Sequence, residues 1–179
     1  YLFGVPRCER EHSAIHVTRR KTLALLAYLA VNARPLSRDA LAALFWPEYD
    51  QSSARANLRR DLSRVKEVVG EAALDTDRSQ VFLDPQAGIW LDVRQFERLI
   101  ETLHDHTGPD GRVDAQGMEA AAQAAGLYST GFMTGFSLPD SSAFEDWQFF
   151  QAESLRQSMA EALQALIAGH TQAGEFERA

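Results

Sequence analysis

One stretch of the sequence, residues 52–69, combines an apolar stripe with a dense cluster of positive charge. At 100° per residue, its apolar side chains fall on one narrow face of a helix. These side chains are those of Ala54, Leu58, Leu62, Val65 and Val69. Between positions 55 and 66 the stretch has five basic residues and one acidic residue, Asp61, a local net charge of +4. Residues 52–69 are therefore predicted to form a helix that packs by one face and presents cations on the other.

The charge of this helix is opposite to that of the whole chain, whose formal net charge is −7. Residues 1–93 include 13 basic and 12 acidic residues, whereas residues 94–179 include 5 basic and 13 acidic ones. A local reversal of charge indicates a polyanionic partner, although a solvated amphipathic helix rich in arginine would show the same pattern. Any contact with nucleic acid is therefore expected from residues 1–93. The acidic second half makes the long-range attraction to such a partner modest.

The pattern before this helix predicts a short hairpin and two further helices. Residues 2–8 and 14–17 flank a polar turn, which is typical of a hairpin. They lead into a predicted helix over about 19–33. Ser37 is suited to cap a second helix, which the Trp-Pro pair at 46–47 ends.

The pattern after the basic helix predicts a wing. Gly70 ends the helix, and the segments 73–77 and 80–84 around Arg78 predict a two-stranded hairpin. Three helices followed by a hairpin, with the third helix basic on its outer face, is the layout of a winged helix-turn-helix. The helix over 52–69 would be about 27 Å long by its rise per residue. It could lie along a DNA major groove, which is about 12 Å wide.

Beyond residue 93 the pattern is wholly helical, with a glycine-bearing loop over 130–141. The predicted helices span 94–106, 115–128, 142–169 and a stretch from Glu175 onward. Ser142 and Glu145 are expected to form a capping box at the start of the third of these helices. Antiparallel helix pairs joined by short loops indicate a tetratricopeptide-like helical module, although no clean 34-residue internal repeat can be shown.

The apolar residues of the last helices are expected to be only partly covered. The residues predicted to face inward from the helix at 142–169 are Phe144, Trp147, Leu155, Met159, Leu163 and Leu166. Because the sequence ends inside a helical pattern, the module is expected to continue beyond it. We therefore expect Leu163, Leu166, Ile167 and Phe176 to be partly exposed, so that the chain self-associates into a homo-oligomer. Trp46, Trp90 and Trp147 are expected to fill cores or the junction between the two halves.

Several of these stretches, in this order, resemble one known family. The stretches are RRKTLALLAYLAV, SRDALAALFWPE, ARANLRRDLSRVK, VFLD and IWLDVRQFERL. They resemble the DNA-binding half of SARP-type bacterial transcriptional regulators. The stretch LYSTGFMTGFSLPDSSAFEDWQFFQAESLR is similar to the opening of the bacterial transcriptional activator domain of the same family. The resemblance covers nearly the whole chain.

The resemblance implies a fold that is mainly α with small β-sheets: a winged helix-turn-helix over 1–93, then a tetratricopeptide-like helical domain over 94–179. It also implies binding to repeated promoter sequences and recruitment of RNA polymerase. In many relatives an ATPase and further helical repeats follow. No GxxxxGK(S/T) sequence occurs in this chain, so nucleotide regulation cannot be read from it.

Two residues on the basic helix are candidates for reading bases. Arg60 lies at the centre of the outer face, and a guanidinium can bond both O6 and N7 of guanine. A phosphate contact or plain solvation is the alternative for Arg60. Asn57 could bind adenine in the same bidentate way, or serve as a local backbone partner near the helix start.

The other candidate residues are expected to contact the DNA backbone. Arg55, Arg59 and Arg64 lie toward the sides of the helix and are suited to phosphate, and Arg59 and Arg64 are also within one turn of Asp61. Ser63 lies on the outer face and belongs to the same predicted set.

The predicted set also includes residues outside the basic helix. Ser37 and Arg38 could hold a phosphate at the start of the second helix, or the serine could be an ordinary cap. Arg78 at the wing tip could enter a minor groove, or be a solvated turn residue.

These features favour a sequence-specific transcription activator that binds double-stranded promoter DNA and RNA polymerase subunits. A protein-interaction adaptor whose winged helix does not read DNA is the alternative. An enzyme is not expected, because the sequence has no metal-ligand cluster, no GxSxG nucleophile motif and no phosphate loop, and no cofactor is implied. His104 and His106 are two residues apart on a helix and diverge, which argues against a metal pair.

Two further features of the sequence indicate the cellular compartment. The single cysteine, Cys8, excludes an internal disulfide framework, fits a reducing cytosol and is expected to pack. The run TLALLAYLAV after three basic residues imitates a secretory signal peptide. It is far shorter than the roughly 20 residues of a membrane span, so a cytoplasmic protein without membrane contact is expected.

Overall fold

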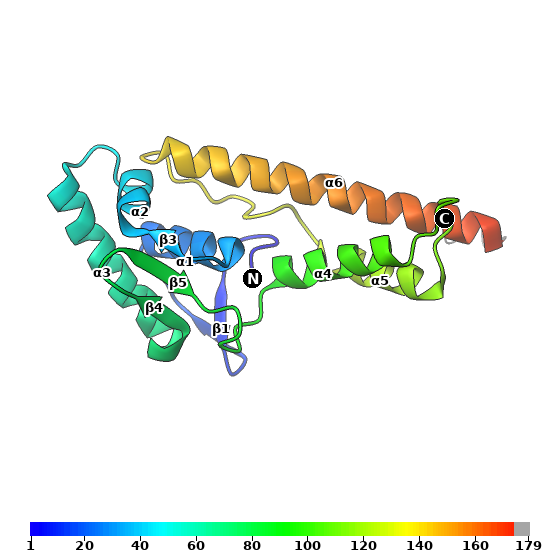
Figure 1. The fold of residues 1–179 in the computed structure, drawn as a ribbon, viewed down its shortest axis with the longest axis horizontal. Helices are drawn as coiled ribbons and strands as arrows, with labels where there is room; N and C mark the ends of the chain where they lie inside the picture. Colours follow the sequence, from blue (N-terminus) through cyan, green and yellow to red (C-terminus); the bar gives the residue numbers. More distant parts are fainter. Residues whose placement is uncertain (174–179) are drawn as a thin grey trace.

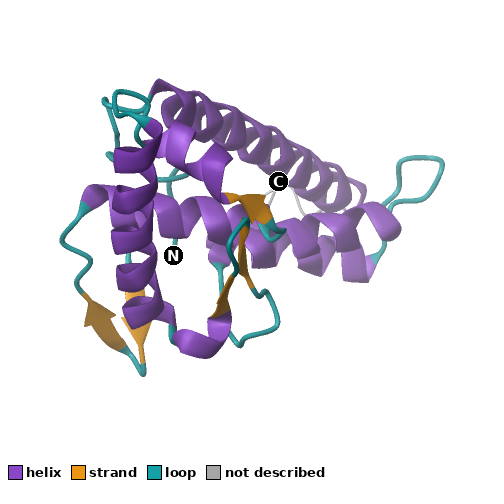
Figure 2. Ribbon diagram, turned by 60° about the vertical axis from the view of Figure 1, so that its left-hand side comes forward, coloured by secondary structure: helices purple, strands orange, loops and turns teal. Residues whose placement is uncertain are grey.

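The computed structural model describes residues 1–173. Small strands and three helices form the first half (Figures 1 and 2). In chain order they are β1 Cys8–Arg10, β2 Ser13–Ile15, α1 Arg20–Asn32, β3 Leu36–Ser37, α2 Arg38–Phe45, α3 Gln51–Val69, β4 Leu74–Thr76 and β5 Gln80–Leu83. Within the described residues, the second half has three helices: α4 Asp92–Asp105, α5 Ala115–Leu127 and α6 Ser142–Ala173. The fold is thus a winged helix followed by a helical domain, as the sequence predicted.

Local side chains set the ends of the helices that carry the predicted site. Ser37 precedes α2, and its hydroxyl accepts the backbone N–H of Ala40 at 3.4 Å. Asp50 caps α3 by accepting the N–H groups of Ser52 and Ser53 at 3.0 and 3.1 Å. Gly70 ends α3 with φ +93°, a conformation that residues with a side chain rarely adopt.

The wing is part of a three-stranded antiparallel sheet with the order β3-β5-β4. β4 and β5 form the predicted hairpin, with Leu74 opposite Leu83. The sequence did not predict β3, because two residues before a helix show no strand periodicity. Its pairing, Leu36 opposite Val81, anchors the wing beside the start of α2.

The N-terminal hairpin is shorter than predicted: it spans residues 8–15, within the predicted 2–17. Its turn is formed by Glu11 and His12, both at positive φ. Arg10 links this hairpin to the end of α3 by donating to the carbonyl of Val68 at 2.6 Å. Cys8 packs against the core, as expected, and burial raises the pKa of its thiol.

Residues 2 and 3, predicted to start the hairpin, bind the second half instead. The backbone N–H groups of Leu2 and Phe3 each donate to the carboxylate of Asp92 at 2.8 Å. The N–H of Met133 donates to the carbonyl of Leu2 at 2.7 Å. Asp92 is the first residue of α4, so the expected boundary at residue 93 falls inside the first turn of that helix.

One continuous apolar core joins the two halves. Phe45 of α2 and Phe144 of α6 are both fully buried, and their ring centroids are 5.5 Å apart. Tyr28 of α1 packs against Trp147 of α6 at 4.8 Å. In Figure 1, α6 runs from above α2, past α4, to the far end of the molecule beyond α5. The winged helix therefore shares its core with the helical half.

Several details of the second half differ from the prediction. The carboxylate of Glu145 accepts the N–H of Leu138, and the N–H of Glu145 donates to the carbonyl of Ser141, so no Ser142–Glu145 capping box forms. The hydroxyl of Ser141 donates to the carbonyl of Leu44 at 2.6 Å, a contact that sequence spacing does not reveal. Helix α6 continues past Gly169, and the helix predicted from Glu175 lies outside the described residues.

The apolar surface also differs in part. Leu163, predicted to be inside, is 44% exposed, and its neighbour Ile167 is 51% exposed, as expected for a partly uncovered face. Self-association through this face stays a prediction, and Phe176 is outside the described residues. Trp90 is not in the core: it is 51% exposed and packs against Tyr1.

Within residues 1–173 there is no helix with the length and hydropathy needed to cross a membrane.

Candidate nucleic-acid interface

Helix α3 lies at one end of the molecule, opposite to α5, with the β4–β5 wing beside it (Figure 1). Its predicted apolar stripe is buried from Ala54 to Val65 and partly buried at Val69. The residues of α3 that were predicted to contact DNA and are exposed are Arg55, Arg59, Arg60, Ser63 and Arg64. The periodicity argument therefore identified which face of α3 is available to a partner.

A surface hollow of about 860 Å³ separates the start of α2, the first half of α3 and the wing tip. Five of the nine predicted residues line it: Ser37, Arg38, Arg55, Arg59 and Arg78. They come from three elements that are far apart in the sequence. The pairing of β3 with β5 brings the wing tip beside α2, and the backbone N–H of Arg38 donates to the carbonyl of Ser79 at 2.8 Å.

Two acids moderate the positive charge of this hollow. Asp39 accepts two hydrogen bonds from Arg55, at 2.6 Å to Nε and 2.7 Å to a terminal nitrogen, and this pair lowers the pKa of Asp39. Asp77 accepts the N–H groups of Gln80 and Ser79, which lowers the pKa of Asp77 and fixes the wing turn. Both carboxyls are therefore ionised at neutral pH.

The remaining cations of the hollow differ in how firmly they are held. In residues 1–173, the side chains of Arg59 and Arg78 make no hydrogen bond or ion pair. Arg38 donates one long bond, 3.3 Å, to the carbonyl of Asp77. Ser37 acts as a helix cap, which was the alternative to a phosphate contact, but its hydroxyl proton is still available to a ligand.

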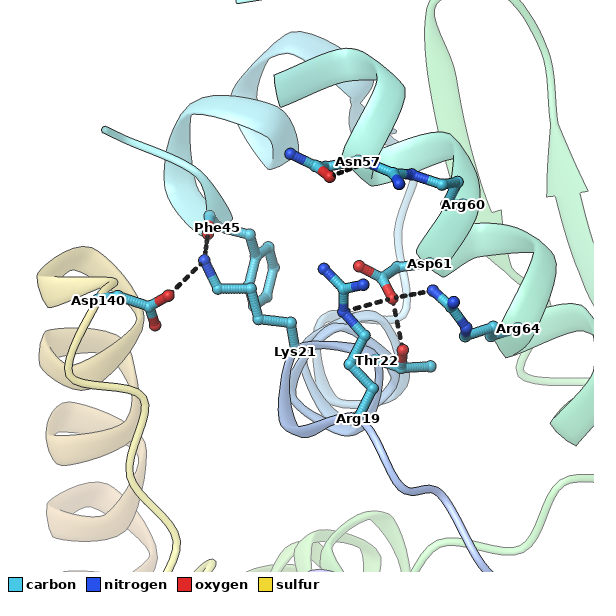
Figure 3. A network of polar contacts seen from close by, with 9 residues as sticks. All are labelled: Arg19, Lys21, Thr22, Phe45, Asn57, Arg60, Asp61, Arg64 and Asp140. Carbon is cyan, nitrogen blue, oxygen red and sulfur yellow. Dashed lines mark hydrogen bonds and ion pairs between the residues drawn. The ribbon is translucent and has the colours of Figure 1, made fainter. Parts of the chain in front are cut away.

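On the outer part of α3, Arg60 and Asn57 form a unit. Asn57 is only 8% exposed, and its side-chain oxygen accepts a hydrogen bond from the guanidinium of Arg60 (Figure 3). The partner of Asn57 is thus a side chain, not the backbone that the sequence suggested as an alternative. Ser63 donates to the carbonyl of Arg59 at 3.2 Å, a bond within the helix.

The other flank of α3 centres on Asp61, whose side chain is fully buried. Its Oδ1 accepts the hydroxyl of Thr22 at 2.6 Å and lies 3.2 Å from Arg64 and 3.3 Å from Arg19 (Figure 3). The pairing with Arg64 was expected from spacing on the helix, whereas Arg59 does not pair with Asp61. A carboxylate beside the first turn of α1, which has no acid of its own, is favourably placed with respect to the helix dipole.

Sequence reasoning missed Arg19, which immediately precedes α1, and Thr22, which lies on it, because no local pattern connects either residue to α3.

The two histidines, His104 and His106, point in different directions, as their spacing predicted. His104 pairs with Glu161 at 3.2 Å and His106 with Asp114 at 2.8 Å, so they diverge. In the part of the chain that the structure describes, no group of three or more acidic, cysteine or histidine side chains is arranged to hold a metal ion.

Comparison with known proteins identifies the fold. No protein-family model and no curated protein matches the sequence. The structure is similar to Mycobacterium tuberculosis EmbR, solved in complex with a low-affinity phosphopeptide, with a TM-score of 0.67 and 18% sequence identity. The match covers 97% of this chain and 45% of the EmbR chain, so this chain spans less than half the length of that protein. The likeness shows the fold, a winged helix followed by a helical domain.

Proposed function

We propose that this protein is a sequence-specific DNA-binding transcription activator. In this proposal α3 lies in the major groove, the wing meets the neighbouring backbone, and the helical half contacts a protein such as an RNA polymerase subunit. The observation that carries the proposal is the hollow between α2, α3 and the wing, where cations from three elements line one surface. Most protein–DNA hydrogen bonds go to phosphate and sugar, and such a convergence is suited to them.

The proposed roles follow from how each side chain is held. Arg60 is exposed on the outer face of α3 and is suited to the O6 and N7 acceptors of guanine. Asn57 is buried and bonded to Arg60, so we assign it the positioning of that guanidinium and not a contact with adenine. Arg59 and Arg78 are assigned to phosphates.

The start of α2 supplies a further backbone contact in this proposal. Ser37 and Arg38 are assigned to one phosphate, with the Ser37 hydroxyl and the Arg38 guanidinium as its donors. Arg55 is expected to contribute less than Arg59, because its charge is already balanced by Asp39. Three to five phosphate-contacting cations predict a slope of log K against log salt between about −3 and −5.

The test is a titration of the whole chain with mixed-sequence duplex DNA at several salt concentrations. Arg59→Ala is expected to weaken binding to all sequences and to reduce the salt slope by about 1. Arg112→Ala is the matched control: it removes one positive charge from the helical half, where Arg112 is 76% exposed beside Asp110. The proposal fails if the wild-type chain does not bind duplex DNA, or if the two variants weaken binding equally.

The second candidate function is a protein-interaction adaptor whose winged helix does not read DNA. Asp39 and Asp77 in the hollow favour it, because both carboxylates would repel a phosphate. In that case the wild-type chain would bind mixed-sequence DNA weakly, and Arg59→Ala would change neither the affinity nor the salt slope.

A further inference from the structure

The cluster around Asp61 has more positive than negative charge. Asp61 is fully buried, and two guanidiniums, those of Arg19 and Arg64, approach its Oδ1. The two arginine side chains are 38% and 45% exposed. A buried carboxylate is costly unless it is paired, and one cation would be enough to balance its charge. The second cation leaves this group with a net charge of +1 at the surface.

Each of the two guanidiniums uses only one of its nitrogens to approach Asp61. Arg19 approaches Asp61 with Nε and Arg64 with one terminal nitrogen. A guanidinium has five N–H donors in a fixed plane, and no other partner of these two side chains lies within the described residues. Figure 3 shows the two arginines reaching Asp61 from different segments, Arg19 from the residue immediately before α1 and Arg64 from α3. Their remaining donors are suited to the oxygens of a phosphate.

The cluster lies on a different flank of α3 from the hollow. Arg64 follows Arg59 by five residues, which at 100° per residue is 140° around the helix. A helix is about 10–12 Å across with its side chains, comparable to the width of the major groove. A helix in that groove therefore faces one phosphate backbone on each flank.

We propose that Arg19 and Arg64 form a second phosphodiester-binding site, on the flank of α3 away from the hollow, and that Asp61 is the positioning residue that holds both guanidiniums. The proposal rests on the proposed function and adds Arg19, the residue immediately before α1, to the DNA interface. The two arginines bind the backbone of one strand while Arg59 and the wing bind the other. Asp61 acts through them and does not itself contact DNA.

The test compares two substitutions that remove the same negative charge from α3. Asp61→Asn removes the buried acid that holds the arginines, and Glu67→Gln removes an exposed acid of the outer face. If only the net charge of α3 mattered, both variants would bind DNA more tightly than the wild type. If Asp61 positions the two arginines, Glu67→Gln binds mixed-sequence duplex DNA at least as tightly as the wild type. In that case Asp61→Asn binds several-fold to about tenfold more weakly, because charge-assisted contacts are lost, with a salt slope reduced by about 1 to 2.

A second variant keeps the test decisive if Asp61→Asn does not fold. Arg19→Gln leaves Asp61 bonded to Thr22 and paired with Arg64, and it is expected to lower the salt slope by about 1. Circular dichroism checks the fold of each variant. The inference is overturned if Asp61→Asn binds as tightly as Glu67→Gln, or if Arg19→Gln leaves affinity and salt slope unchanged while Arg59→Ala lowers both. The absence of DNA binding by the wild-type chain would instead reject the proposed function itself.

Discussion

At the scale of single residues, the contact between Arg60 and Asn57 determines how a base could be read. Because Asn57 is buried, its amide group is fixed by packing and in turn limits the directions open to the Arg60 guanidinium. A pre-oriented arginine loses less conformational freedom when it meets a base. We therefore expect the two residues to act on the same base position.

Arg60→Ala is predicted to cost roughly 1–3 kcal/mol on the preferred DNA site and to relax preference at one base position. Asn57→Ala should relax the same position by a smaller amount, and the double variant should cost less than the sum of the two, because the residues share one interaction. Binding to a set of duplexes with single-base changes measures this. Ser63→Ala, also on the exposed face, is the control and should leave base preference unchanged. Equal loss on preferred and unrelated duplexes for Arg60→Ala would assign Arg60 to phosphate instead.

Sequence periodicity predicted which arginines of α3 are exposed but not what they contact. Helical spacing relates residues within about one turn, so it anticipated the pair Asp61–Arg64. It could not anticipate that Arg55 would pair with Asp39, or that Arg19 would reach Asp61. These partners are brought together by the crossing of helices in the tertiary structure, for which local sequence holds no signal.

At the scale of elements, the start of α3 depends on one exposed carboxylate. Hydrogen bonds from the side chains and backbone N–H groups of Ser53 and Ser52 lower the pKa of Asp50 from 3.8 to about 2. A carboxyl whose pKa is lower in the folded state stabilises the fold above its unfolded pKa, and this stabilisation is lost as the pH falls through the folded value. The contribution of Asp50 should therefore be complete above about pH 4 and disappear toward pH 2.

Asp50→Ala is predicted to lower the Tm at neutral pH by roughly 2–4 °C, because a helix cap is lost. The difference in Tm between this variant and the wild type should shrink between pH 4 and pH 2. Asp50→Asn is the matched control, since asparagine also caps helices but does not titrate in this range. Thermal unfolding followed by circular dichroism measures all three proteins. A difference that stays constant down to pH 2 would show that the Asp50 charge does not contribute.

Element order could be predicted from sequence more fully than element ends. The three helices, the wing and the later helices each have a strong period or a clear breaker, such as Gly70. Strand β3 was missed because it depends on a distant partner, Val81 opposite Leu36. The start of α6 at Ser142 was predicted correctly, but its capping box was not, because Glu145 accepts the N–H of Leu138 instead.

At the scale of the whole molecule, the two halves are tied together more tightly than two predicted domains would suggest. Lys21 of α1 binds Asp140 at 2.7 Å and the carbonyl of Phe45 at 2.7 Å. Arg20 donates to the carbonyl of Ser137 at 2.6 Å. The position of α3 and the wing is therefore linked to the loop before α6. Charge counts separate the halves, but they hold no information on the shared core.

Phe144→Ala is predicted to lower the free energy of unfolding by about 3–5 kcal/mol, because it leaves a cavity between α2 and α6. Both halves should still unfold in one transition, since Phe144 and Phe45 pack in the same core. Denaturation followed in parallel by tryptophan fluorescence and by circular dichroism at a helical wavelength measures this, with Phe144→Leu as the milder control. Two separate transitions in the wild-type chain would contradict a shared core.

The most direct test of the central claim, that this chain reads DNA sequence through α3, is selection from random duplexes by the whole wild-type protein. The account predicts enrichment of one motif, with a guanine position that is lost when the selection is repeated with Arg60→Ala and retained with Arg112→Ala. Recovery of unenriched sequences by the wild-type protein would contradict it.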